Sequence, residues 1–559
     1  MKKIIITTIL ASLAVSLSAQ DMYDAINFSR NTYYGTARSL AMGNAMTALG
    51  GDLGSYVINP AGSAVSDYSQ FAFTPGIVTS RTSASYYSDG SSITGSGSDS
   101  RARFFVPNVG VTLVMDTGND YGVKNVSFGF QVSGTNNFQR YVNAAGPNSS
   151  TSFLGSLAAA ASGMSPEDFG RSLDAGYWAN QFGHFGRGEN YAGSNQVIDP
   201  YESYCYVPGT INQRAVYNTY GNKTDILFNF GVNINDVLFL GANIGMPTLR
   251  YNRYECFYES SADPTQFPVH FVESETSMVT TNYLSSSNEY KYSSSASGIY
   301  AKIGVIWLPV DGVRIGAAFR TPTSMTISED WQYLASSEYA DSRFNSNAHS
   351  SLGEYSYNLR TPYSANVGAA FTFGPMGLVS IDYELEDFSS MRFRSRNVDD
   401  SSSSEWFGVN ETNRLFCGLA HNLRLGGELR VLPQFALRAG YNFITSPERY
   451  YQDVSGVRIT AEDYLDGNGR PRPISLGDAR YFQDFTHAFS FGVGYSSDGS
   501  FYADLAVRMT SLPSKDYYPY QYGAYNALDK NGNLLNVSDP YILIKNNLWD
   551  VALTLGWRF

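Results

Sequence analysis

The chain has 559 residues and a net charge of −12, and charged residues make up only 16% of it, below the about 25% typical of soluble domains. Aromatic residues reach 15%, while long aliphatic helix-forming residues are sparse. This composition favours an all-β protein. The acidic balance argues against nucleic acid as a partner, because nucleic-acid binding needs a basic surface.

Residues 1–19 have the pattern of a secretory signal peptide. Two lysines precede an apolar run from Ile4 to Val15, and small residues follow as far as Ala19, where cleavage is expected. No later run reaches the about 18 apolar residues that a membrane-spanning helix needs. The mature chain is therefore predicted to be exported and to have no spanning helix.

Residues 20–66 are predicted to form an N-terminal hatch, a small segment folded inside another structure. Small residues recur at close spacing between Gly35 and Gly62, so a short helical turn can pack there without a large apolar face. The segment ends in Asn59-Pro60-Ala61-Gly62, where the proline fixes φ, removes a donor and favours an extended Asn59. We expect these four residues to act as a hinge or gate.

Polar and apolar residues alternate with a period of two from Phe71 to Phe559. At the C-terminus Trp549, Val551 and Leu553 share one face, and the residues between them are small or polar. Because alternate side chains of a strand point to opposite faces, this pattern predicts strands with one apolar face. About 14 are expected, near residues 70–80, 103–115, 124–136, 223–234, 237–255, 298–308, 313–328, 355–373, 378–394, 416–431, 434–445, 485–496, 500–510 and 543–559.

The connections between these strands are of two kinds. Short turns, such as Asn235-Asp236, alternate with long excursions rich in Ser, Tyr and Asn. Outer-membrane barrels have this layout, with short periplasmic turns and long extracellular loops. The sequence thus predicts a transmembrane antiparallel β-barrel over residues 67–559 in the outer membrane of a Gram-negative cell. The hatch is expected inside it, and an even strand number places both termini on the periplasmic side.

A set of charged residues falls on the polar faces of the predicted strands. On the lipid face a Lys or Arg at mid-depth would cost about 2–4 kcal/mol, so these residues are expected to face the barrel interior. There they either hold the hatch through ion pairs or, in part, line a path for a solute. They are Lys302, Arg314, Arg320, Asp382, Glu384, Glu386, Arg424, Glu428, Arg430, Arg438, Asp504 and Arg508.

The longest excursion is predicted to contain two short helices, over residues 151–163 and 166–183. Ser165 is placed to cap the second, with Pro166 at its first position. The apolar faces of these helices either pack over the barrel mouth or form a groove that captures a ligand. Their residues are Phe153, Leu154, Leu157, Phe169, Leu173, Tyr177, Trp178 and Phe182.

The residue patterns predict no metal site, no cofactor and no catalytic site. Residues 529–533 begin like a calcium loop, but Pro540 stands where a bidentate Glu is needed. The five histidines lack a tight metal-binding spacing, and His487 has no nucleophile motif near it. Cys205 and Cys256 lie in predicted extracellular segments, where they either pair as a disulfide or stay free.

Three stretches resemble one known family. They are ARSLAMGNAMTALGGDLGSYVINPAG, GIYAKIGVIWLPVDGVRIGAAFRTPTSM and the terminal LWDVALTLGWRF. Together they resemble the long-chain fatty acid outer-membrane transporter family of the FadL/TodX type. That resemblance implies a 14-stranded barrel with an N-terminal hatch, in which Asn59, Pro60 and Ala61 match the hatch triplet. It also implies a lateral opening at an inward kink of the third strand, which we assign to Gly134.

The resemblance implies transport of a hydrophobic small molecule, captured outside and released sideways into the bilayer after the hatch moves. The ligand is left open among a fatty acid, an aromatic hydrocarbon, a haem-like molecule and another lipid. The other partners expected are outer-membrane lipid and, through the C-terminal Phe559, the barrel assembly machinery, with a single barrel as the working unit. Two alternatives remain: a docking barrel for secreted surface proteins, as in type IX secretion, and a surface adhesin or antigen.

Overall fold

The computed structural model describes residues 22–88, 92–186, 188–201, 203–274, 277–396, 406–453, 455–465, 470–520 and 527–559. The predicted signal peptide lies outside the described residues.

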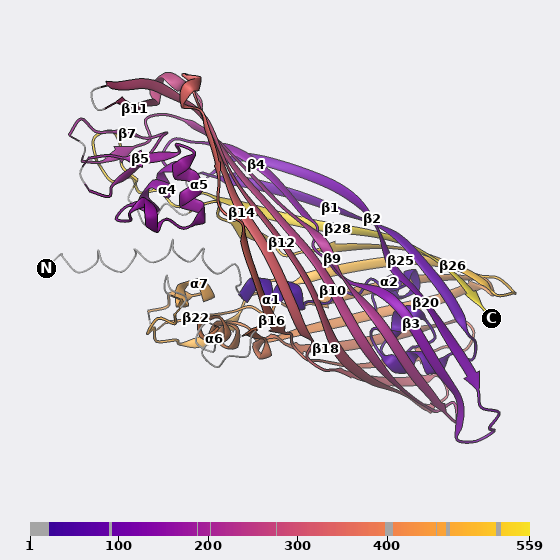
Figure 1. Ribbon diagram of the computed structural model, residues 1–559. Helices are drawn as coiled ribbons and strands as arrows, with labels where there is room; N and C mark the ends of the chain where they lie inside the picture. The colour runs from indigo at the N-terminus through magenta and orange to yellow at the C-terminus, as the bar shows by residue number, and fades with distance from the viewer. Residues whose placement is uncertain are drawn as a thin grey trace.

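The strands form a closed antiparallel barrel with 14 positions around its wall (Figure 1). The ring closes because β1 (Gln70–Tyr87) pairs with β2 (Ile93–Asp116) on one side and with β28 (Tyr541–Arg558) on the other. The remaining wall strands are β3 (Val123–Asn137), β4 (Arg140–Asn148), β9 (Ile211–Ile234), β10 (Leu238–Ser261), β12 (Ser277–Val310), β13 (Val313–Arg320), β14 (Ser324–Tyr339), β16 (Gly353–Arg360), β17 (Ser364–Thr372), β18 (Gly377–Asp387), β19 (Arg392–Ser395), β20 (Leu419–Leu432), β21 (Phe435–Ile444), β25 (Thr486–Ser496) and β26 (Phe501–Ser511).

Every predicted strand range coincides with a wall position. The predicted strand 313–328 is interrupted between β13 and β14, and the same holds for 355–373 between β16 and β17 and for 378–394 between β18 and β19. The fold class predicted from the alternating pattern is therefore confirmed.

One face of the wall is apolar and exposed, and the other is buried. On β28, Trp549 and Val551 are 41% and 40% exposed, whereas Asp550 and Thr554 are buried. The exposed set continues around the barrel, for example with Phe128, Phe230, Ile303, Phe371 and Phe491. This band has the chemistry of a surface in contact with lipid.

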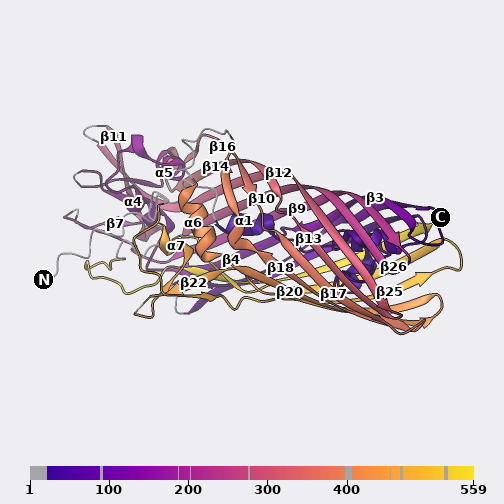
Figure 2. The same cartoon turned by 90° about the horizontal axis from the view of Figure 1, so that it is seen from below.

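Several strands continue far beyond the apolar band. β12 has 34 residues, or about 110 Å at about 3.3 Å per residue, whereas about 9–11 residues cross a bilayer. From Ile299 towards the long loops, the next outward-facing residues of β12 are Ser297, Ser295 and Ser293. The wall therefore extends past the apolar band on the side of the long loops, and Figure 2 shows α4 (Phe153–Ala161), α5 (Arg171–Trp178) and α6 (Phe407–Phe416) gathered at that end.

The helix predicted over 151–163 is found as α4, but the prediction of 166–183 is wrong in extent. Pro166–Asp168 form a single 3-10 turn without a side-chain cap from Ser165. The extended backbone at Phe169 and Gly170 separates this turn from α5, and Phe182 already belongs to a short strand.

The disulfide alternative is also wrong, because Cys205 and Cys256 are both free thiols. No helix in the described part of the chain is both long and apolar enough to cross a membrane.

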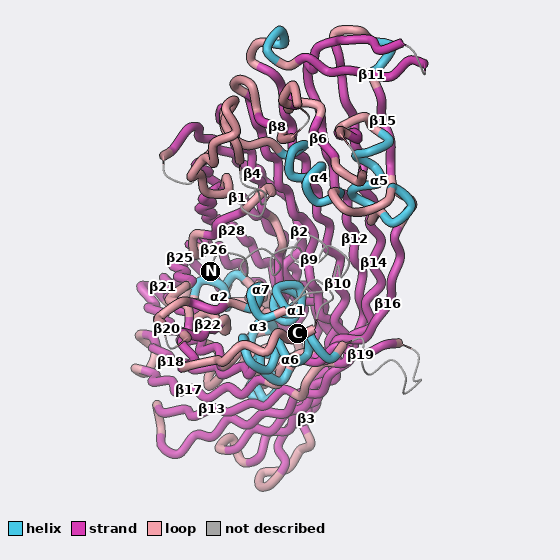
Figure 3. The backbone as a smooth tube through the Cα atoms, turned by 90° about the vertical axis from the view of Figure 1, so that its left-hand side faces the viewer, coloured by secondary structure: helices cyan, strands magenta, loops and turns pink. Residues whose placement is uncertain are grey.

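The residues from Met22 to Ser66 lie inside the ring of strands (Figure 3). They form α1 (Met22–Ser29), α2 (Ala37–Ala41), α3 (Leu53–Tyr56) and the 3-10 helix η2 (Pro60–Val65). We call residues 37–66 the plug and residues 30–36 the link between α1 and the plug. The chain leaves the lumen after Val65 and enters the wall at Gln70.

Candidate functional site

The plug packs closely against wall positions that are occupied by glycine. A methyl group added to Gly304 would lie 1.9 Å from Asn59 Oδ1, and one added to Gly316 would lie 2.1 Å from the carbonyl oxygen of Thr47. Any larger residue at these positions would collide with the plug. The wall glycines that meet the plug in this way, which we call the glycine belt, are Gly231, Gly241, Gly304, Gly316, Gly368, Gly426, Gly440 and Gly492.

Charged wall side chains bind the backbone of the plug. Lys302 Nζ donates to the carbonyl of Val57 (2.9 Å), and Arg314 Nη1 donates to the carbonyl of Leu49 (2.8 Å). The carboxylate of Asp382 accepts from the amide of Thr47 (2.7 Å). These are hydrogen bonds with one charged partner, which are stronger than neutral ones.

The charged residues lie on the inner face of the wall as predicted. Arg430 is 56% exposed, but it lines the same space as Arg38 and Glu428. Ion pairs also reach the hatch. Within the described residues they are Arg38 with Glu428 (2.9 Å) and the longer contact of Arg30 with Glu448 (3.9 Å). The wall charges hold the hatch mainly through its peptide groups.

The four predicted gate residues are all buried at the base of the plug. Asn59 Nδ2 donates to the carbonyl of Thr47 (2.7 Å) and to that of Val305 in β12 (3.1 Å), and Asn59 Oδ1 accepts from the amide of Ala61. Pro60 occupies the first turn of η2, where its missing N–H costs nothing. Gly62 packs so closely on Ser55 that a methyl group would lie 2.5 Å from its hydroxyl. Asn59 thus joins two parts of the plug to the wall.

Strand β3 leaves its neighbour β2 at the predicted kink. Their pairing ends at Asn108 and Ser133, and the pairing of β3 with β9 has a bulge between Gly134 and Asn136. Beyond this point the carbonyls of Gly134 and Thr135 accept hydrogen bonds from the amides of Tyr34 (2.9 Å) and Thr32 (2.7 Å). The link therefore takes the place of β2 as a backbone partner, inside the lumen.

Tyr34 fills the seam that the two strands leave. Its ring meets Phe105 of β2 edge to face at 5.2 Å, and the guanidinium of Arg508 lies 4.7 Å from its centre. On the outer surface beside it, Phe104 is 64% exposed in the apolar band. We call the seam between residues 101–106 of β2 and β3 beyond Gly134 the side window. Tyr34 closes it from within.

A cavity of about 370 Å³ lies in the lumen beside the side window. A ligand site commonly has a volume of about 300–1,000 Å³. The lining combines polar and apolar groups from α1, the link and the wall. Among them are Tyr23, Asn27, Arg30, Tyr34, Asn136, Phe138, Arg140 and Lys515. One space of ligand size thus touches both α1 and the residue that closes the window.

The residues predicted to form an extracellular groove lie in and around a packed cluster. Leu154, Leu157 and Phe182 are buried against wall residues such as Tyr283 and Tyr339. Phe153, Phe169 and Leu173 are half-buried, and Trp178 is exposed. Packing over the barrel mouth accounts for the burial of Leu154, Leu157 and Phe182. Capture of a ligand by this surface stays a prediction.

Sequence reasoning missed α1, Tyr34, Phe105 and Lys223. Pro107 was a local signal for the break in β2. It lies within the predicted strand 103–115, and a proline has no N–H to donate in strand pairing. The described residues contain no group of three His, Cys, Asp or Glu side chains that could hold a metal. His487 bonds to the hydroxyl of Tyr441 (2.9 Å).

No family model and no curated protein matches this chain. The solved structures that are similar include a FadL homologue of Pseudomonas aeruginosa, with 12% identity, 94% of this chain and 98% of that chain covered, and a TM-score of 0.47. The toluene transporter TodX of P. putida is 12% identical, with 94% and 98% covered and a TM-score of 0.45. The toluene transporter TbuX of Ralstonia pickettii is 13% identical, with 94% and 98% covered and a TM-score of 0.44.

Proposed function

We propose that the protein moves hydrophobic, fatty-acid-like small molecules from the cell surface into the outer membrane. The observation that carries this proposal is the lumen cavity, which meets the side window at Tyr34 while the plug fills the barrel beneath it. A solute in this cavity has a shorter way out through the wall than through the plug.

The route needs no chemical step. A hydrophobic solute gains about 25 cal/mol per Å² of apolar surface when it leaves water for an apolar surface at the extracellular end. It passes to the lumen cavity, the hatch shifts, and the solute leaves between β2 and β3 into lipid. The movement follows the concentration gradient of the solute. It is also favoured because a hydrophobic solute has a lower free energy in lipid than in water.

Uptake of a fluorescent fatty acid into liposomes that contain the purified barrel tests transport. We expect Pro60→Ala, and deletion of residues 35–62, to change the uptake rate while the barrel still shows the heat-dependent gel migration of a folded protein. Unchanged uptake in both variants would argue against a role for the hatch.

Photo-crosslinking with a diazirine fatty acid tests the lateral exit. We expect labelling of Tyr34, Phe104 and Phe105 that excess unlabelled fatty acid suppresses. Labelling of Phe373, in the apolar band but away from the window, serves as the control for contact with bulk lipid. Equal and non-competable labelling at all four positions would contradict exit through the window.

Docking of a secreted surface protein is a second candidate function. The observation that favours it is the wall beyond the apolar band, which ends in a hairpin of β11 (Pro268–Ser274) and β12 with Val272 and Met278 75% and 64% exposed. Co-purification of a stoichiometric protein partner that is lost on deletion of this hairpin would support docking. Full fatty acid uptake by the same deletion variant would separate the two functions.

A further inference from the structure

A groove lies on the outer surface of the wall, beside the side window. Beyond Asn108 strand β2 stays paired with β1 but has left β3, and it overlaps β4. The overlap is close, because a methyl group on Gly97 would lie 1.8 Å from the carbonyl oxygen of Asn143. Residues 101–103 of β2 and outward-facing side chains of β4, β9, β10 and β12 line a space of about 690 Å³. We call this space the outer groove.

The outer groove begins at the edge of the apolar band. Phe104, which belongs to the band and is 64% exposed, directly follows Arg103 of the lining. On β12, Ser293 and Lys291 line the groove beyond Ile299, on the side of the long loops. In a Gram-negative outer membrane this level holds the head groups of the outer leaflet, many of which are phosphorylated sugars. The groove is therefore open to these head groups.

The exposed charged residues of the outer groove are all cations, although the whole chain has a net charge of −12. They are Arg101, Arg103 and Lys291, while the half-buried Arg253 and Asp330 have opposite charges. In the described part of the chain Arg103 has no ion-pair partner. Arg101 and Lys291 each meet a carboxylate of their own strand, at 3.5 and 3.2 Å. Exposed pairs of this kind contribute little, so an added anion can compete for these cations.

Tyrosines form much of the floor of the groove. Tyr141, Tyr220 and Tyr254 come from β4, β9 and β10, and the guanidinium of Arg101 lies 4.5 Å from the centre of the Tyr141 ring. A tyrosine presents an apolar ring and a hydroxyl, which suits the C–H faces and hydroxyls of a sugar. An arginine presents a planar fork that binds two phosphate oxygens at once. Basic pockets at a membrane surface commonly bind phosphorylated lipid head groups.

We propose that the outer groove binds the phosphorylated sugar head group of an outer-leaflet glycolipid, of the lipopolysaccharide type. Arg101, Arg103 and Lys291 bind the phosphates, the tyrosines contact the sugars, and the acyl chains lie on the apolar band at Phe104. This inference depends on the position of the barrel in the outer membrane and not on transport. A glycolipid bound there forms part of the lipid that meets the side window.

Binding of fluorescent short-chain lipopolysaccharide to the full-length protein in detergent tests the inference. We expect the double variant Arg101→Gln/Arg103→Gln to bind about tenfold or more weakly, because it lacks hydrogen bonds from two charged groups. Arg343→Gln/Arg414→Gln removes the same charge at sites 61% and 55% exposed outside the groove, and should bind as the wild type does. Dephosphorylated lipopolysaccharide should bind the wild type as weakly as the intact lipid binds the groove variant. Equal binding by the wild type and a folded groove variant, or equal binding of both lipids, would overturn the inference.

Photo-crosslinking in intact cells provides a second test that leaves the cations in place. Tyr220, in the groove, and Tyr258, outside it on β10, are each 39% exposed. With benzoylphenylalanine at either position, we expect a crosslinked product that contains the phosphorylated glycolipid from position 220 only. Equal capture at both positions, or capture of a protein or a fatty acid in place of the glycolipid at position 220, would overturn the inference.

Discussion

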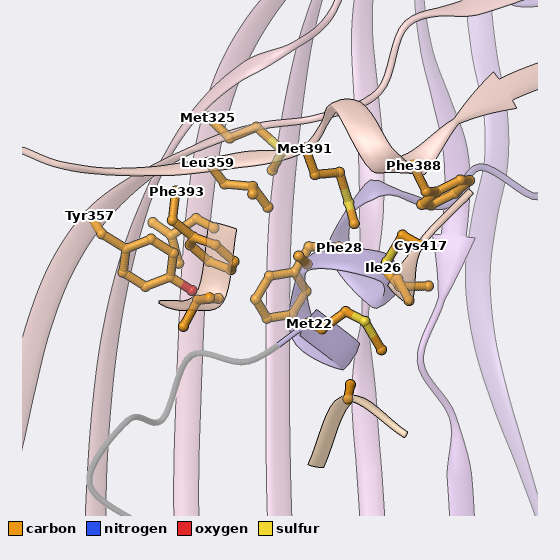
Figure 4. Packing of buried hydrophobic residues seen from close by; sticks show 14 of the residues in the cluster. Met22, Ile26, Phe28, Met325, Tyr357, Leu359, Phe388, Met391, Phe393 and Cys417 are labelled. Carbon is orange, nitrogen blue, oxygen red and sulfur yellow. The ribbon is translucent and has the colours of Figure 1, made fainter. Parts of the chain in front are cut away.

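The plug and α1 are both buried in the same lumen, but different forces hold them. The plug meets the glycine belt in contacts too close for a wall side chain, and Lys302, Arg314 and Asp382 bind its peptide groups. Helix α1 packs in an apolar chamber formed by wall and loop residues such as Leu249, Met325 and Phe393 (Figure 4), and Lys223 of β9 binds the carbonyl of Phe28 at its end. The plug also has apolar contacts with the wall, but charged wall side chains bind its peptide groups, whereas the side chains of Met22, Ile26 and Phe28 in α1 meet only an apolar cluster.

This difference indicates which part of the hatch a hydrophobic solute can move. An alkyl chain cannot replace a lysine or an aspartate that binds a buried peptide group, because the group would be left without a partner. It can replace Met22, Ile26 and Phe28, which contribute only apolar surface. The plug is thus suited to keep the barrel closed, and α1 is suited to respond to the solute.

The largest effect is expected from removal of a buried charge beside the plug. Glu428→Leu leaves Arg38 and Arg438, which lie 2.9 and 2.7 Å from that carboxylate, without this partner. Breaking a buried ion pair costs about 3–5 kcal/mol. We expect a marked fall in the temperature at which the barrel unfolds in detergent. Asp236→Asn, at an exposed turn, is the control, and an equal fall in both proteins would contradict the account.

A side chain placed in the glycine belt should displace the plug. A methyl group on Gly426 would lie 2.5 Å from the carbonyl oxygen of Met42, whereas on the adjacent Gly427 it would meet nothing closer than 4.0 Å. We expect Gly426→Val to destabilise the protein by about 1–3 kcal/mol through overpacking. Thermal unfolding of Gly426→Val and Gly427→Val measures the difference. Similar melting of the two variants would show that the plug does not press on the wall.

Loss of the Asn59 side chain should loosen the base of the plug. Asn59→Ala leaves the carbonyls of Thr47 and Val305 and the amide of Ala61 without this partner. Each buried group left unpaired costs about 1–3 kcal/mol, less where water reaches it. We expect faster proteolysis of the plug, with Asn119→Ala in an exposed turn as control. Wild-type protease resistance would rule out a structural role for Asn59.

The smallest effect on the whole barrel is expected from a change in α1. Phe28→Ala removes a buried ring from the apolar chamber, but α1 contributes no strand to the wall. We expect the unfolding temperature to stay near that of the wild type while the amides of α1 exchange faster. A large fall in unfolding temperature would show that α1 is part of the structural core and not a displaceable occupant.

The wall was predictable from sequence, and the working parts of the lumen were not. Apolar and polar residues alternate in stretches such as Trp549 to Phe559, because one face of the strand meets lipid and the other meets the lumen. Each strand could therefore be predicted from its own residues. The interior position of Arg424 or Asp382 followed from the same rule. The side window depends on Thr32 and Tyr34 meeting the bent β3 about a hundred residues away. Pro107 marks a break in β2, but no local pattern encodes this long-range contact.

Hydrogen exchange measured by mass spectrometry, with and without a saturating fatty acid, tests most directly whether the solute moves α1 and leaves the plug in place. We predict that the fatty acid increases exchange in residues 22–29 and leaves residues 37–66 protected. Faster exchange in the plug with no change in α1, or no change in either, would contradict the account.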